Sequence, residues 1–482
     1  MLLALLLIAD ALPSQTRLEA AVREALAGSC PGAAVAIDPD LTRGCRAYVD
    51  AAAAGRSKVS GSAASFYASL QSIEPAPVSG VATVSPPSRA DRAVGDLFPR
   101  SCRFNRNGVG AAVLPSGEAL VCALAANHGT NLSPIPGLVE PGASVEVKGR
   151  LAPGLTHPRL YAMRPSGEVE ELKLATGPAG FSAQVLLRDK GEHSLEILAD
   201  GAGGPQVCAL RRVFAGVPAP TSSPPEPPAG RGLPGVEASI HALRAAHGLP
   251  ALERDPELDA VAEGHCREMV RLRTFAHVLP TDGNLTDRLR KRGYAYRMAG
   301  ENIGLSDAAE TAHDAIVGSP AHLANLLDPR HRRLGLGAVK GATSEGSEAV
   351  YLTEVLALPI VGSADPAGDV AALILETRKK RGLPALARDR TLDAIARREA
   401  QAAAKAEGPL KIQGDAAGEA LDALPDLRSA VAEVFVSSAP DEATASTNLS
   451  EPRWTRLGVG ALYGSSKVYG SGRLWVVLLY GR

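Results

Sequence analysis

The sequence predicts an α+β protein of several domains, in which helix-and-sheet units accompany one small antiparallel β-sandwich. Three observations lead to this prediction. One passage with helix and strand signals is written twice, at 248–338 and again at 382–461. Residues 144–187 alternate between apolar and polar and are interrupted by Gly and Pro, which is typical of short strands. A Pro-rich stretch at 216–234 separates these two kinds of sequence and cannot build a core.

The repetition is close at both of its ends. Residues 248–262 and 382–396 are identical at eleven of fifteen positions. The Arg-Leu-Gly-Leu-Gly-Ala run that starts at Arg333 returns as Arg-Leu-Gly-Val-Gly-Ala from Arg456. The offset is 134 in the first block and 123 in the second, so the later copy lacks about eleven residues between them.

The residues able to carry chemistry differ between the copies. His277, Glu301 and His322 lie in the middle of the first copy. At the two offsets His277 corresponds to Lys411 and His322 to Ala445, while Glu419 is the expected counterpart of Glu301. We therefore expect a polar site in the first copy and none in the second.

Composition limits the classes of partner. The net charge of −1 gives no electrostatic reason to expect nucleic acid or an anionic membrane as a partner. Residues 1–11 combine a short apolar run with an Ala-x-Ala arrangement, which predicts a secretory signal; an N-terminal amphipathic or buried helix is the alternative. Nothing else approaches the roughly 20 apolar residues of a membrane span. We therefore expect a secreted, periplasmic or cell-envelope protein.

The six cysteines show no C-x-x-C spacing, which excludes zinc-ribbon and thioredoxin-like sites. In an oxidising compartment, Cys30–Cys45 and Cys102–Cys122 are the candidate local disulfides, although the connectivity stays open. Cys266 lies inside a helical pattern and is expected to be a buried free thiol.

The domain organisation follows from these changes in composition and in the spacing of apolar residues along the chain. We expect, in order, the signal at 1–11, a mixed α/β segment at 12–127, an immunoglobulin-like β-sandwich at 128–215, the Pro-rich linker at 216–234, one intact helix-and-sheet domain at 235–360 and its degenerate copy at 361–482. The segment 12–127 is either a third, degenerate copy or an unrelated α/β segment, since its Gly-Val-Gly match at 108–110 is short.

Residues 235–360 read as helices first and strands afterwards. Asp255 before Pro256 predicts a helix start, with an N-cap and a proline at the first helical position. Asp307 and Glu310 fit a capping box for a later helix. Two strands are expected at 334–340 and 349–356. Helices followed by antiparallel strands predict a layered α+β domain.

The motifs of this region resemble those of a bacterial CAP domain, the superfamily of cysteine-rich secretory proteins, antigen 5 and pathogenesis-related 1 proteins, whose bacterial branch is called SCP-like. They are Phe275-Ala276-His277, Gly300-Glu301-Asn302-Ile303, Ser319-Pro320-Ala321-His322 and Gly335-Leu336-Gly337. The resemblance implies a secreted αβα-sandwich with a cleft of histidines and acidic residues, which in some members binds a divalent metal. It extends more weakly over 361–482.

The resemblance places His277, Glu301 and His322 in this cleft. Two imidazoles and a carboxylate are also a sensible ligand set for zinc, with one position left for water. Glu354 stands where the family often has Gln and joins the cleft if its side chain points inward. Ile316 stands where the family often has Trp.

The remaining histidines have plainer interpretations. His265 lies on an apolar helix stripe and is expected to be a satisfied core residue. His313 and His331 stand beside charged residues and are expected to be solvated.

The resulting expectation is a secreted, non-enzymatic module that binds a lipid, a glycan or a cell-wall component through the cleft, with a divalent cation such as zinc as the candidate cofactor. Two alternatives remain open: a metal-dependent hydrolase of an extracellular polymer, and a structural or adhesive envelope protein. No convincing nucleophile supports the hydrolase, because Ser319 precedes Pro320 and fits a helix cap better.

Overall fold

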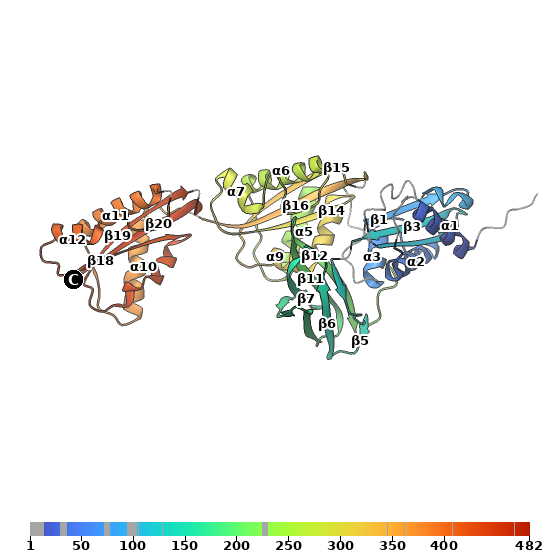
Figure 1. Cartoon of the computed structure of the whole chain (residues 1–482), viewed down its shortest axis with the longest axis horizontal. Helices are drawn as coiled ribbons and strands as arrows, with labels where there is room; N and C mark the ends of the chain where they lie inside the picture. Colours follow the sequence, from blue (N-terminus) through green and yellow to red (C-terminus); the bar gives the residue numbers. More distant parts are fainter. Residues whose placement is uncertain are drawn as a thin grey trace, which may run out of the picture.

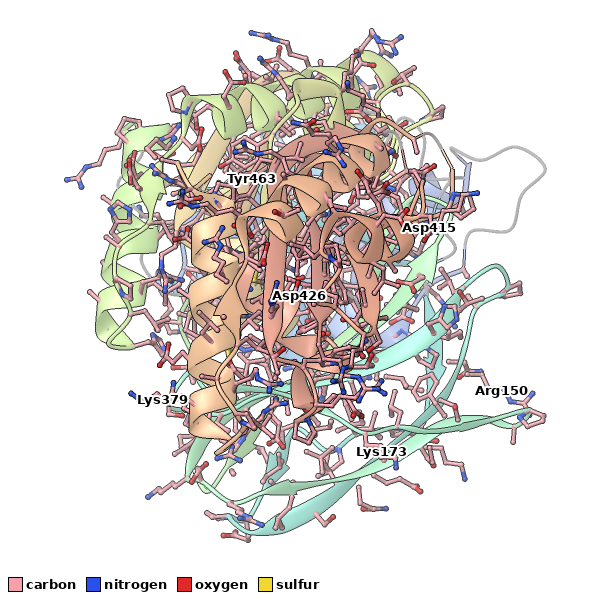
Figure 2. The ribbon with its side chains drawn as sticks, turned by 90° about the vertical axis from the view of Figure 1, so that its left-hand side faces the viewer. Arg150, Lys173, Lys379, Asp415, Asp426 and Tyr463 are labelled. Atoms are coloured by element: carbon pink, nitrogen blue, oxygen red, sulfur yellow. The ribbon has the colours of Figure 1, made fainter. Side chains whose placement is uncertain are left out.

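The computed structural model of the chain describes residues 14–28, 36–71, 78–93, 104, 106–127, 129–223, 230–344, 346–360, 362–406, 408–466 and 468–482. The N-terminal unit lies at one end of the long axis and the C-terminal unit at the other, and the β-sandwich and the unit from 233 to 359 lie beside each other between them (Figure 1). In the end-on view of Figure 2, Lys379 and Asp426 mark the C-terminal unit, while Arg150 on a strand and Lys173 between two strands mark the β-sandwich behind it. No helix of the described residues is long and apolar enough to cross a membrane. The predicted signal at 1–11 lies outside the described residues.

The N-terminal unit packs helices against an antiparallel sheet of strand order β1-β3-β2. Its elements are α1 (Gln15–Gly28), α2 (Pro39–Ala53), α3 (Gly61–Gln71), β1 (Val78–Val84), β2 (Arg106–Val113) and β3 (Ala119–Ala126). Cys45 on α2 and Cys122 on β3 are free thiols in the core, and the Cys122 thiol donates to Cys45 Sγ at 3.1 Å. The predicted partners of these two residues, Cys30 and Cys102, lie outside the described residues. The two local disulfides therefore stay predictions.

Residues 130–215 form a β-sandwich of two sheets, with strand orders β4-β6-β10-β9 and β5-β12-β11-β7-β8. The strands are β4 (Thr130–Leu132), β5 (Leu138–Val139), β6 (Ala143–Leu151), β7 (Thr156–Met163), β8 (Val169–Leu172), β9 (Ala175–Gly177), β10 (Gly180–Leu187), β11 (Gly191–Gly201) and β12 (Gly204–Ala215). Inward residues of both sheets, such as Val147 and Ile197, share one core. Strands β7, β8 and β11, together with the tip of the β11–β12 hairpin, contact the next unit of the chain.

The unit from 233 to 359 has three layers, with α6 on one face of a sheet of order β13-β15-β16-β14 and α5 and α8 on the other. Its elements are α5 (Leu233–Ala246), β13 (Glu253–Arg254), α6 (Pro256–Leu272), α7 (Leu285–Arg292), β14 (Tyr296–Ser306), α8 (Ala309–Val317), α9 (Pro320–Leu326), β15 (Arg333–Ala342) and β16 (Glu348–Pro359). The Asp255 carboxylate accepts from the backbone N–H of Glu257 and begins α6 as an N-cap.

The capping box expected at Asp307 and Glu310 does not form. Instead, Asp307 accepts from the Thr311 hydroxyl, and the Glu310 carboxylate accepts the backbone N–H groups of Arg231 and Gly232. Glu310 therefore ties the end of the Pro-rich segment to α8.

The C-terminal unit repeats this arrangement with the order β17-β19-β20-β18. Its elements are α10 (Pro366–Lys380), β17 (Ala387–Arg388), α11 (Arg390–Lys405), α12 (Ala416–Ala423), β18 (Ala430–Ser437), the 3₁₀ turns η3 (Pro440–Ala445) and η4 (Asn448–Ser450), β19 (Arg456–Ser466) and β20 (Gly470–Gly481). In both units a two-residue strand makes the one parallel pair of its sheet, β13 with β15 and β17 with β19. The other strand pairs of the two sheets are antiparallel.

A buried arginine makes the same bonds in both units. Arg244 on α5 donates to the carbonyl oxygens of Pro250 at 2.9 Å and Leu326 at 2.7 Å. Arg378 on α10 donates to those of Pro384 at 3.0 Å and Leu449 at 2.7 Å. Each guanidinium thus fastens the end of its helix to two turns, which the repeated sequence did not reveal.

Two glycines let α6 lie directly on β15. A Cβ at Gly335 would collide with the backbone of Leu258, and one at Gly337 with the backbone nitrogen of Glu263. Gly458 and Gly460 meet the backbone of α11 in the same way. The repeated Gly-x-Gly is therefore a packing requirement, because a helix cannot approach a strand this closely over a side chain.

This packing predicts the effect of a single methyl group. Gly337→Ala should destabilise the 233–359 unit by more than about 2 kcal/mol, since backbone would have to move. Gly264→Ala is the matched control on α6: open space surrounds that position, so the variant should be neutral or more stable by up to about 1 kcal/mol. Hydrogen exchange of peptides from α6 and β15 measures both. Equal protection in the two variants would contradict the packing argument.

Candidate functional site

The structure brings His277, Glu301 and His322 together from three different elements. His277 lies in the loop after α6, Glu301 on β14 and His322 on α9. The His277 Nδ1 lies 2.9 Å from Glu301 Oε1. The two imidazole rings have centroids 6.4 Å apart and planes inclined by 18°. We call the site formed by these two rings and Glu301 the histidine recess.

The Glu301 carboxylate is almost enclosed, with its side chain 4% exposed, and both oxygens are occupied. Oε1 faces His277, and Oε2 accepts from Arg288 on α7. Burial alone would raise the pKa of Glu301. The hydrogen bond to His277 and the charge of Arg288 outweigh burial, so the pKa lies below its usual value. Glu301 is therefore an anion held between two donors.

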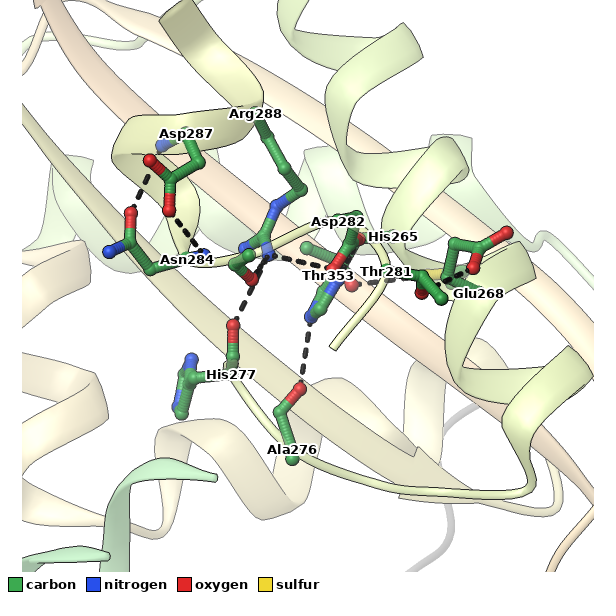
Figure 3. Close-up of polar contacts among 12 residues, drawn as sticks. His265, Glu268, Ala276, His277, Thr281, Asp282, Asn284, Asp287, Arg288 and Thr353 are labelled. Carbon is green, nitrogen blue, oxygen red and sulfur yellow. Dashed lines mark hydrogen bonds and ion pairs between the residues drawn. The ribbon is translucent and has the colours of Figure 1, made fainter. Parts of the chain in front are cut away.

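A longer polar network continues from Arg288, and Figure 3 shows Asp282, His265, Ala276 and His277 around it. Arg288 also donates to the carbonyl oxygens of His277 at 3.2 Å and Gly283 at 2.9 Å, and lies 3.6 Å from Asp282. Asp282 in turn lies 2.8 Å from Nδ1 of His265, whose Nε2 lies 3.0 Å from the Ala276 carbonyl oxygen. His265 has no solvent exposure and is the satisfied core histidine that its helix stripe predicts. The network fixes the loop that carries His277.

His322 is held by Ser319 and Asn302. Its Nδ1 lies 2.5 Å from the Ser319 hydroxyl, and its carbonyl oxygen accepts from the Asn302 amide at 3.2 Å. Burial, and next the nearby His277, lower the pKa of His322 to about 4. The imidazole is therefore neutral at physiological pH, with its Nε2 free of any protein bond among the described residues.

Glu354 does not join this set. Asn302 is its cross-strand partner on β14, whereas Glu301 pairs with Val355, so Glu354 and Glu301 lie on opposite faces of the sheet. The Glu354 carboxylate is buried between His313 Nδ1 at 2.7 Å and the Asn302 amide at 3.2 Å. Its side chain points inward, but into the layer that holds α8.

The expected solvation of His313 and His331 is wrong, because both are only 1% exposed. His313 also lies 3.1 Å from the Ser239 hydroxyl on α5. Charged neighbours in the sequence did not reveal the burial of His313, because neighbouring side chains of helix α8 point to different faces, and His331 is buried in the segment before β15.

The residues as arranged do not offer zinc three protein ligands. Both oxygens of Glu301 are committed, and the positive charge of Arg288 beside it disfavours a second cation. Among the described residues, no group of three His, Cys, Asp or Glu side chains is placed to hold one ion. Zinc sites in proteins require at least three such ligands.

The C-terminal unit has no equivalent of the recess among its described residues. Strand register places Glu433 opposite Leu478 as Asn302 lies opposite Glu354, so Ala432 occupies the position of Glu301. Glu419 lies on α12 and not on the strand that corresponds to β14, so the prediction that it is the counterpart of Glu301 is wrong. Glu433 bonds the Asn448 amide at 2.6 Å, and this pair replaces the bond between Asn325 and Asn302.

Comparison with known proteins identifies the class of this domain. Residues 238–355 match the model of the cysteine-rich secretory protein family, CAP, and the chain therefore contains a CAP domain. An uncharacterized protein, YkwD of Bacillus subtilis (strain 168), is 31% identical over 104 residues. That match covers 21% of this chain and 40% of the relative, so the chain spans less than half of the relative's length.

Solved structures with local similarity include two bacterial surface or extracellular proteins. An outer surface protein from Borrelia burgdorferi is 19% identical, with 26% of this chain and 92% of that one covered and a TM-score of 0.24. An extracellular protein containing a SCP domain from Bacillus anthracis str. Ames is 18% identical, with 48% and 86% covered and a TM-score of 0.23.

The pKa of His322 predicts a defined loss of stability in acid. A histidine whose pKa is lowered on folding stabilises the protein above its unfolded value of about 6.5, and this contribution is lost as the pH falls toward about 4. Between pH 7 and 5 the CAP domain should lose up to about 2 kcal/mol from this group.

His322→Gln should reduce that pH dependence, whereas His247→Gln, at an exposed helix end, should leave it unchanged. Hydrogen exchange of peptides from α9 and β14 at the two pH values reports the local free energy. The same pH dependence in His322→Gln and wild type would contradict the assignment.

Proposed function

We propose that the chain is an extracellular, non-enzymatic binding protein whose CAP domain takes its ligand at the histidine recess. The observation that carries the proposal is the buried Arg288–Glu301–His277 chain. Burying two opposite charges costs free energy that packing alone would not require, and such networks cluster at functional sites. The family match of the domain supports an extracellular role.

The chemistry of the recess supports binding over catalysis. Its imidazoles have their Nδ1 atoms engaged by Glu301 and Ser319, which leaves two Nε2 atoms to meet a ligand. The nearest candidate nucleophiles are not activated. Burial raises the pKa of Cys266 to about 12. The Ser319 hydroxyl is buried between Glu196 and His322, so its oxygen is not presented to a substrate.

A hydroxyl-rich ligand fits this arrangement. The free nitrogen of a neutral imidazole accepts a hydrogen bond from a hydroxyl group. Phe275, two residues before His277 in the same loop, is 44% exposed, and its ring lies 6.5 Å from that of Tyr351. Polar groups next to an exposed aromatic side chain suit a sugar ring, so we favour a cell-wall glycan over a lipid.

The C-terminal unit is proposed as a degenerate CAP copy that supports the chain without a recess of its own. The shared strand order, the paired arginine clamps and the Gly-x-Gly contacts support a common origin. Ala432 and Ala445 remove the acid and one imidazole.

Sedimentation with purified insoluble peptidoglycan tests the function. His277→Ala and His322→Ala should each weaken binding at least about tenfold, because each removes one of two acceptors. His247→Ala, an exposed histidine at the end of α5, is the matched control and should bind as wild type.

Equal binding by all three variants would refute the role of the recess. If the wild-type chain does not bind peptidoglycan but binds phospholipid vesicles, the proposed ligand is a lipid instead of a glycan. Metal analysis of the purified protein tests the zinc prediction separately. If wild type contains zinc and both His277→Ala and His322→Ala lack it, the zinc prediction is correct.

A further inference from the structure

A carboxylate of the β-sandwich lies against the histidine recess. Glu196 is on the central strand β11 and has no solvent exposure. Burial raises the pKa of this group to about 7, although its hydrogen bonds act in the opposite direction. A carboxylate in such a position is costly unless it has specific partners, and both partners of Glu196 belong to the CAP domain.

Those partners are at the start of α9. Glu196 Oε1 accepts from the Ser319 hydroxyl at 2.5 Å, and Oε2 accepts from the backbone N–H of Ala321 at 2.8 Å. Ser319 occupies the N-cap position of α9, but its hydroxyl makes no capping bond to its own helix. The cap that the Ser-Pro motif predicts is thus supplied by a residue more than a hundred positions away.

The same hydroxyl links Glu196 to His322. Ser319 Oγ lies 2.5 Å from His322 Nδ1, and its single hydrogen is used toward Glu196. When Glu196 is ionised, the hydrogen between Ser319 and His322 must therefore come from Nδ1. This leaves Nε2 of His322 as an acceptor, which is the tautomer that the binding role requires.

A second contact reaches the other histidine. At the tip of the β11–β12 hairpin, the carbonyl oxygen of Gly203 accepts a hydrogen bond from the backbone N–H of Val278 at 2.9 Å. A Cβ at Gly204 would lie 3.0 Å from the Cβ of His277, so only a glycine allows this approach without displacement. One hairpin therefore touches both segments that carry the recess histidines.

We propose that the β-sandwich is the second wall of the histidine recess and that Glu196 is a positioning residue that sets the tautomer of His322 through Ser319. The sandwich is then a part of the binding site and not a spacer. This inference deepens the proposed function and rests on it for its purpose, but its test needs no ligand.

Glu196→Gln is the sharpest variant because it preserves size. The amide oxygen can still accept from Ala321, while the amide nitrogen now donates to Ser319. Ser319 must then donate to Nδ1 of His322, and the imidazole changes to the Nε2–H tautomer. Nitrogen chemical shifts of the labelled imidazoles in the full chain, at about pH 8.5 where Glu196 is ionised, distinguish the two forms. His322→Ala identifies the signal.

Glu196→Ala tests the wall. Diethyl pyrocarbonate should modify His277 and His322 at least about fivefold faster than in wild type, because the contact that closes the recess is lost. Glu192→Ala is the matched control, since Glu192 lies on the same strand and pairs with Arg212 away from the recess. Its rates should equal those of wild type.

An unchanged tautomer in Glu196→Gln would overturn the positioning role, and unchanged modification rates in Glu196→Ala would overturn the wall. If Glu196→Ala fails to fold, Ser319→Ala replaces it, with the same expected acceleration at His322. If both expected results for the Glu196 variants are found while His277→Ala still binds peptidoglycan normally, the contact of the β-sandwich with the recess is confirmed and the proposed binding of a glycan is wrong.

Discussion

The ionised carboxylate of Glu301 is the group on which the site depends. An anion with so little exposure requires compensation, and the chain supplies it from two directions, with Arg288 on α7 and His277 in the loop after α6. Arg288 is in turn held by the backbone carbonyl oxygens of His277 and Gly283 and lies close to Asp282. Three segments, α7, the loop after α6 and β14, are thereby joined by charged and polar bonds as well as by apolar packing. Removal of either partner would leave a buried charge, which couples the geometry of the recess to the stability of the domain.

The sequence was sufficient where the pattern was local or repeated. The start of α6 and the two late strands followed from a cap and from periodicity, whereas the convergence of His277, Glu301 and His322 was implied by the resemblance to CAP domains. Arg288 and Asp282 were missed because they carry no motif and act through tertiary distance. The side of the sheet that Glu354 faces depends on register, which one strand alone does not define. Glu196 could not be found at all, since its partners lie in another domain.

The comparison of the two similar units separates structural residues from functional ones. The buried arginines Arg244 and Arg378 and the close glycines are the same in both units, because helix attachment and helix–strand approach are needed for either to fold. The positions of Glu301 and His322 are alanines in the second unit, and an Asn–Asn bond has become a Glu–Asn bond. A position that changes while the surrounding scaffold persists was not needed for that scaffold. This difference supports the proposal that Glu301 serves the binding site, whatever stability it also provides to the first unit.

The position of Glu196 has a consequence for comparing this chain with its relatives. The family match spans 238–355, so the residue that orients His322 lies outside the part of the chain that the family describes. A CAP domain that lacks this sandwich must cap α9 by other means, and its Ser319 equivalent is then free to bond its own helix or the imidazole. The tautomer of the second histidine would differ, and with it the hydrogen-bonding partner that the recess accepts. Ligand preference in this chain is thus a property of two domains in contact, and similarity confined to one of them does not transfer it.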